Sequence, residues 1–125
     1  MKIPPDTFEG QMITGYGPGW VSVNGEKILH SVAISARGRR EIWPCNEFSA
    51  LCADHFSQLA LLQADLVIFG SGHRLRFPRP EWLRELVEKR IGVETMDTAA
   101  ACRTYNILAG EGRNVVVALL LEQGL

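Results

Sequence analysis

The sequence has few cysteines, no excess of charge of either sign and no long apolar run. Lys and Arg total 13 against 14 Asp and Glu, which gives a formal net charge of −1. A chain so balanced has no broad positive field for phosphate backbones, and this argues against a nucleic-acid partner. The longest apolar runs, such as Val115–Leu121, have the length of a strand and fall far below the ~20 residues that span a bilayer. We therefore expect neither nucleic-acid binding nor membrane insertion.

The cysteines are too few and too scattered for a disulfide framework or a zinc site. Cys45, Cys52 and Cys102 are an odd number at wide spacings, and no C-x2-C pair or closely spaced histidine pair accompanies them. Reduced thiols are the ordinary state in the cytosol. The first ten residues also lack the apolar stretch of a secretory signal and the Arg-rich helix of a transit peptide. The sequence therefore predicts a cytoplasmic protein that holds no metal and no cofactor.

The first forty-odd residues have the pattern of β structure. Runs rich in β-branched and aromatic residues alternate with turns that contain glycine. The pair Asn24-Gly25 suits a two-residue hairpin turn, because both residue types adopt a positive φ readily. The predicted strands are Met12–Tyr16, Trp20–Val23, Ile28–Ala36 and Glu41–Trp43.

The second half of the chain alternates between helix and strand patterns. Apolar residues at three- and four-residue steps predict helices, and short continuous apolar runs predict strands covered on both faces. The helices are expected over Phe48–Leu62, from Pro80 to Ile91 and over Thr98–Ala109, and the strands over Ala64–Phe69, Val93–Met96 and Val115–Leu121. This order favours one α/β domain over residues 1–125, with the amino-terminal hairpins extending the sheet or packing beside it.

A candidate site lies where two of these strands end. If the strands that end at Phe69 and Met96 are parallel neighbours, their carboxyl ends open on the same edge, where α/β sheets bind ligands. One interpretation is a small-molecule or anion pocket made of backbone N–H groups and arginine. The other is a tight turn beside a helix that Asp97 caps, since that carboxylate would use the free N–H groups itself. The candidate residues are Gly70, Ser71, Gly72, Asp97, Thr98, Arg103, Asn106 and Arg113.

No residue near this edge is predicted to be catalytic. Ala99–Ala101 present little bulk, which predicts a helix that lies very close to the sheet. Cys102 follows them and is expected to be a buried packing residue rather than a nucleophile. Ser71 lies near His73, but no third residue is available to orient that pair.

Three segments carry a resemblance to a known family: GYGPGWVSVNG, ADLVIFGSGHRLRFP and GVETMDTAAACRTYNILAGEGRNVVVALL. Together they resemble the domain of unknown function 498 family over nearly the whole chain. The resemblance implies an α/β fold of three layers with a mixed central β-sheet, N-terminal β-hairpins and about three flanking helices.

The same resemblance bears on function. The mitochondrial branch of that family acts as an assembly factor for respiratory complex I, so the resemblance implies a non-enzymatic protein whose partner is another protein. The absence of a transit peptide favours a bacterial cytosolic source over a mitochondrial one. The alternative function is a small-molecule or anion-binding protein or enzyme that uses the edge formed by Gly70–His73 and Asp97–Arg103.

Overall fold

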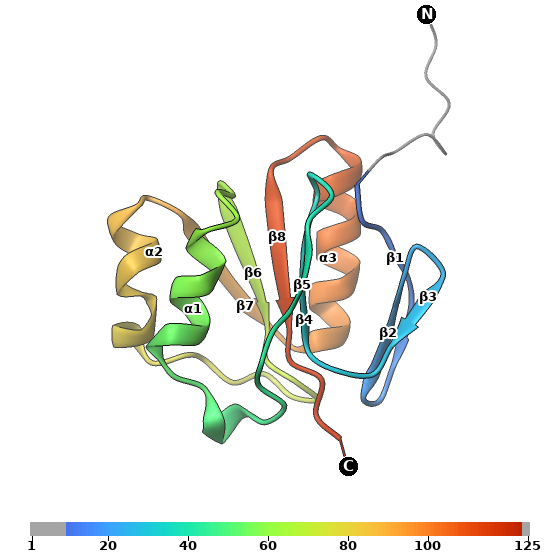
Figure 1. Ribbon diagram of the computed structural model, residues 1–125, viewed down its shortest axis with the longest axis horizontal. Coiled ribbons are helices and arrows are strands. Elements are labelled where there is room, and N and C mark those ends of the chain that lie inside the picture. Colours follow the sequence, from blue (N-terminus) through green and yellow to red (C-terminus); the bar gives the residue numbers. More distant parts are fainter. Residues whose placement is uncertain (1–9, 124–125) are drawn as a thin grey trace, which may run out of the picture.

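A five-stranded mixed sheet forms the centre of the computed structural model, which describes residues 10–123 (Figure 1). The strand order is β5-β4-β8-β6-β7, with β6 parallel to both of its neighbours and β4 antiparallel to both of its own. The carboxyl ends of β6, β7 and β8 therefore share one edge, as the candidate site requires. The strands are β4 Val32–Ser35, β5 Arg40–Ile42, β6 Leu66–Gly70, β7 Gly92–Met96 and β8 Val115–Leu119. The expected absence of a leader concerns residues 1–9, which lie outside the described residues.

Helices cover both faces of this sheet (Figure 1). On one face, α1 (Ala53–Ala60), α2 (Arg84–Glu88) and the short 3-10 turns η2 (Phe48–Ala50) and η3 (Pro80–Leu83) close over an apolar cluster. Trp43, Phe56 and Phe69 meet edge to face within that cluster. On the other face lies α3 (Thr98–Gly110). The predicted α/β fold with a mixed sheet and three flanking helices is confirmed.

The amino-terminal hairpins form a sheet of their own. Strands β1 (Ile13–Gly17), β2 (Trp20–Val23) and β3 (Glu26–Ile28) are antiparallel and lie beside α3 (Figure 1). Their buried residues share one apolar cluster with α3 and the central sheet. Asn24 has a φ of 50° and Gly25 a φ of 85°, which confirms the predicted hairpin turn. Of the two arrangements that the sequence allowed, the hairpins pack beside the central sheet rather than extending it.

The predicted strand Ile28–Ala36 is wrong in one respect, because the chain leaves one sheet and enters the other within it. Strand β3 ends at Ile28 and β4 begins at Val32. Leu29 is exposed at the crossing, while the buried Ser31 accepts a hydrogen bond from the Leu121 N–H through its hydroxyl at 2.8 Å. No glycine or proline marks this break, so the alternating pattern of the sequence runs through it.

Two of the predicted helices are interrupted. The segment Phe48–Leu62 divides at Cys52, whose extended backbone (φ −150°) precedes α1, and the His55 imidazole accepts the Cys52 N–H. The segment that begins at Pro80 starts as a 3-10 turn and becomes α-helical only at Arg84. In both cases most of the apolar side chains still face the sheet, although Val87 is 65% exposed, and the periodicity therefore did not reveal the interruption.

The close contact that the alanine run predicts is present. A Cβ atom on Gly70 would lie 3.1 Å from the Ala101 Cβ and 3.1 Å from the Thr98 Cα. Ala101 and Cys102 are fully buried between the sheet and α3. The helix therefore touches the end of β6 almost backbone to backbone, and this contact fixes where α3 begins.

Candidate functional site

The edge predicted from the sequence is held together by the side chain of Thr98. Its hydroxyl accepts the Gly72 N–H and donates to the Leu120 carbonyl, each at 2.9 Å. The Thr98 N–H in turn donates to the Gly72 carbonyl at 2.9 Å. One residue at the start of α3 thus joins the loop after β6 to the segment after β8.

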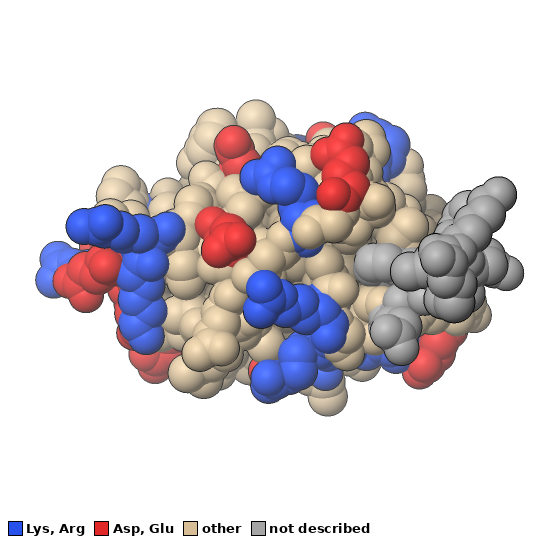
Figure 2. Space-filling view, turned by 90° about the horizontal axis from the view of Figure 1, so that it is seen from above, with Lys and Arg blue, Asp and Glu red and all other residues tan. Residues whose placement is uncertain are grey.

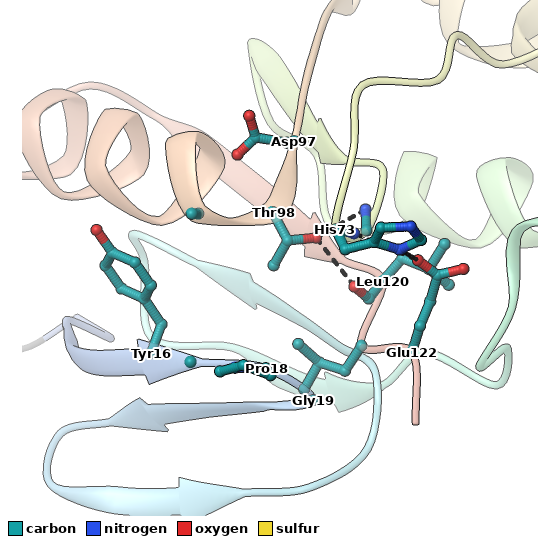
Figure 3. A pocket seen from close by; sticks show the side chains of 12 residues that line it. Tyr16, Pro18, Gly19, His73, Asp97, Thr98, Leu120 and Glu122 are labelled. Atoms are coloured by element: carbon teal, nitrogen blue, oxygen red, sulfur yellow. Dashed lines mark hydrogen bonds and ion pairs between the residues drawn. The ribbon is translucent and has the colours of Figure 1, made fainter. Parts of the chain in front are cut away.

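A pocket of about 490 Å3 opens between this edge and the turn that joins β1 to β2 (Figure 3). Figure 3 shows Tyr16, Pro18 and Gly19 on one side and Thr98 on the other, with Leu120 and Glu122 between them. Most of the lining is apolar or glycine, and none of the Lys or Arg residues in the described part of the chain belongs to it. The lining residues are Tyr16, Gly17, Pro18, Gly19, Gly72, His73, Asp97, Thr98, Ala99, Leu120, Leu121 and Glu122.

A small ionic group at one wall of the pocket is centred on Glu122, whose side chain is only 10% exposed. Its Oε1 atom accepts hydrogen bonds from the Arg76 guanidinium, from the His73 N–H at 3.3 Å and from His73 Nδ1 at 2.8 Å. Burial acts to raise the pKa of Glu122, but these hydrogen bonds outweigh it and hold the pKa below its usual range. The carboxylate is therefore charged at neutral pH and already paired within the fold.

The other polar candidates at the edge are also used internally. The Asp97 carboxylate accepts the Ala100 N–H at 2.8 Å, which confirms it as the helix cap. The buried Ser71 hydroxyl donates to the Arg74 carbonyl at 2.8 Å and accepts the Arg76 N–H at 2.9 Å. With two carboxylates in its lining and the helix cap occupied, the pocket does not favour an anion.

The three remaining candidates on and after α3 lie at different places. Arg103 is exposed and donates to the Tyr16 hydroxyl at 2.9 Å, so it reaches the rim of the pocket through that side chain. Asn106 accepts the Ile13 N–H at 2.9 Å and donates to the Ile13 carbonyl at 2.7 Å, which attaches β1 to α3. Arg113 follows the far end of α3, about 20 Å from the pocket at 1.5 Å of rise per helical residue. Of the eight candidates, Gly72, Asp97 and Thr98 line the pocket.

Sequence reasoning missed the two walls that come from distant parts of the chain. One is the turn Tyr16–Gly19, and the other is the segment Leu120–Glu122. The Gly-Pro-Gly sequence marks a turn, but only the packing of the small sheet on α3 brings it opposite Thr98. Glu122 carries no local signal, because its partners His73 and Arg76 lie more than forty residues earlier.

The Cys102 thiol of α3 is buried, as the sequence predicts. Burial raises the pKa of the Cys102 thiol to about 12, which disfavours its thiolate at neutral pH. Within residues 10–123 no group of three or more His, Cys, Asp or Glu side chains is placed to hold a metal ion. Within the same residues no helix has both the length and the apolar character that crossing a membrane requires.

The fold and the site define a small α/β protein whose sheet edge carries an apolar pocket with internally paired polar groups. The sequence profile of the family described as "Protein of unknown function (DUF498/DUF598)" matches residues 13–120. The chain belongs to this family, as the resemblance of its three segments implied.

Two relatives and one solved structure place the chain more closely. It is 30% identical over 113 residues to NADH dehydrogenase [ubiquinone] 1 alpha subcomplex assembly factor 3 of Danio rerio, covering 89% of this chain and 64% of that protein. It is 34% identical over 119 residues to an uncharacterised protein of Rhodobacter capsulatus, covering 94% and 90%. A crystal structure of a protein from Bordetella parapertussis matches with a TM-score of 0.86 at 38% identity, covering 93% of this chain and 99% of that one. The chain thus spans a little less than two thirds of the length of the Danio rerio assembly factor.

Proposed function

We propose that this chain is a non-enzymatic protein-binding factor that assists the assembly of a multisubunit complex, with the pocket receiving an apolar side chain of its partner. By similarity to the assembly factor of Danio rerio, the complex would be a respiratory NADH dehydrogenase. The proposal keeps the cytoplasmic location and the absence of a nucleic-acid ligand that the sequence predicts.

The observation that carries this proposal is that most polar groups of the pocket already bond to other parts of the chain, the His73 Nδ1 atom to Glu122 among them. The Thr98 hydroxyl, the Asp97 carboxylate and the Glu122 carboxylate all bond to other parts of the chain. The His73 Nε2 atom has no partner among residues 10–123, but a catalytic centre also needs a group for that base to activate. The nearby Ser71 hydroxyl bonds to Arg74 and Arg76 instead. What the pocket offers instead is shape and apolar surface, which is what a partner's side chain needs.

The face shown in Figure 2, at the end of the molecule away from the pocket, agrees with this choice of partner. Basic and acidic side chains are interspersed there with uncharged surface, and neither sign covers the face. A nucleic-acid partner would favour a continuous basic stripe.

The test is complementation with a variant whose pocket is filled. Ala99 lines the pocket at the start of α3, and Ala99→Phe would place a ring in it. The matched control is Ile107→Phe on the same helix, where the side chain is 61% exposed. In cells that lack the gene, we expect less assembled NADH dehydrogenase on native gels, restored by the wild type and by Ile107→Phe but not by Ala99→Phe. Normal assembly without the gene would refute the part of the proposal that concerns this complex.

A small-molecule binder is the second candidate, and the size of the pocket favours it. Ligand sites generally measure about 300–1,000 Å3, a range that includes the 490 Å3 found here. Native mass spectrometry of the purified protein distinguishes the two functions. A bound mass that is present in the wild type and in Ile107→Phe but absent from Ala99→Phe would support a small ligand.

A further inference from the structure

The segment Arg74–Arg79, which leads away from the pocket, has two faces of different character. Arg76 and Pro78 point into the protein: the Arg76 guanidinium donates to the Ser71 carbonyl at 2.7 Å, and Pro78 is buried. Leu75 and Phe77 point outward and are 51% and 69% exposed. This alternation of period two is that of a strand with one face on the protein and the other in solvent.

The backbone of this segment is also unpaired at Leu75 and Phe77. The Leu75 and Phe77 N–H and carbonyl groups form no hydrogen bond with any other residue in the range 10–123. Backbone groups left open along an extended segment are the usual template for pairing with a strand of another chain. The inward side chains meanwhile fix the segment in place, since Arg76 also bonds to Glu122 and lies 4.9 Å from the Phe48 ring.

The charge of the segment selects the kind of strand that fits. Arg74 and Arg79 are exposed at its two ends, and no acidic residue lies between them. Acidic side chains opposite arginines stabilise a strand pair, and like charges opposite each other destabilise it. We propose that Arg74–Arg79 pairs with an extended segment of the partner protein that carries acidic residues beside aliphatic ones. This inference rests on the proposed function in taking a protein as the ligand.

The same features disfavour the other occupants. A second copy of this chain would bring arginine against arginine. An anionic membrane surface is usually bound by four to eight basic residues, and this segment has two that are exposed. A lipid surface would also leave the backbone groups of Leu75 and Phe77 without partners.

The experiment is selection from a random dodecamer peptide library displayed on phage, followed by affinity measurements on the resynthesised peptides. We expect enrichment of sequences with acidic residues beside aliphatic ones. We expect their affinity to fall by about tenfold in Phe77→Ser and in Arg74→Glu/Arg79→Glu, since a few central residues carry most of an interface. The matched controls Ile107→Ser and Arg113→Glu, exposed positions in and after the second half of α3, should bind as the wild type does. Amide exchange at Leu75 and Phe77 should slow when the peptide is bound.

The remaining outcomes overturn the inference. The first is a library that yields no enriched sequence, and the second is a set of enriched peptides that bind every variant equally. The third is amide hydrogen exchange at Leu75 and Phe77 that a bound peptide leaves unchanged. Phe77-dependent dimers in sedimentation would assign the segment to a second copy, and arginine-dependent binding to vesicles of equimolar phosphatidylserine and phosphatidylcholine would assign it to a membrane. Ala99→Phe should leave peptide affinity unchanged, so the pocket proposal and this one fail separately.

Discussion

Replacing Asn106 by alanine should weaken the attachment of the small sheet to α3. The Asn106 amide forms two hydrogen bonds to Ile13, at 2.9 Å and 2.7 Å, across 93 positions of the chain. Each such bond stabilises a protein by about 0.5–1.5 kcal/mol net, and the Ile13 N–H and carbonyl would be left partly buried without partners. Alanine favours the helix by about 0.5 kcal/mol more than asparagine. Two bonds contribute about 1–3 kcal/mol, so the expected loss after the helix gain is about 0.5–2.5 kcal/mol of the free energy of unfolding.

Urea denaturation followed by circular dichroism measures this loss. With a slope of about 1–3 kcal/mol per M for a chain of this size, the midpoint should fall by about 1 M. Ile107→Ala, one position further along and exposed, should change the free energy of unfolding by less than about 0.5 kcal/mol. If Asn106→Ala unfolds at the same urea concentration as the wild type, these two hydrogen bonds do not hold β1 to α3. Asn106 would then be free for the partner-binding role that the sequence suggested.

Three further perturbations test the contacts around the site. Gly70→Ala should lower the free energy of unfolding by about 1–3 kcal/mol, because the new methyl group would press on the backbone of α3; a variant as stable as the wild type would show that this contact can yield. Glu122→Gln should be less stable than the wild type at neutral pH, because a lowered pKa stabilises the fold while the carboxylate is charged. The difference should begin to shrink as the pH falls below the ordinary value of 4.5 and vanish below the lowered pKa of Glu122; a difference that persists in stronger acid would contradict the pairing. Thiol labelling should modify the exposed Cys52 first, Cys45 more slowly because burial raises its pKa, and Cys102 only after unfolding.

Much of the central layer could be predicted from the sequence, because its signals are local. The helix from Thr98 begins after the Asp97 cap, as the sequence indicated, and β6 and β7 are the parallel neighbours that the candidate site needed. The predicted strands of the second half agree with the observed ones to within two residues at each end. A polar residue that caps a helix and a short apolar run that forms a strand each involve only a few neighbouring residues. Such patterns can therefore be recognised in one segment at a time.

The pocket could not be predicted in the same way, because its walls meet only through long-range packing. The turn at Pro18 reaches Thr98 because the small sheet lies on α3, and that arrangement depends on pairs such as Asn106 with Ile13. Asn106 itself illustrates the difficulty. An amide on a mostly apolar helix indicates that a polar partner exists, but the sequence does not distinguish a ligand from the backbone of a strand 93 positions away.

The energetics of the pocket indicate that it acts together with a second contact. Burying one Leu or Phe side chain contributes about 1.5–3 kcal/mol of favourable free energy. A complex with a millimolar Kd already has a net binding free energy of about 4 kcal/mol, so its contacts must supply more than that to offset the cost of association. The Thr98, Asp97 and Glu122 side chains already bond within the chain, so they add little to the free energy of binding a partner. The segment Arg74–Arg79 begins two residues after Gly72, which lines the pocket, so one partner chain can reach both. If both proposals hold, either Ala99→Phe or Phe77→Ser should weaken binding of the partner strongly. The two changes in binding free energy should add in the double variant, because the two side chains do not share a contact.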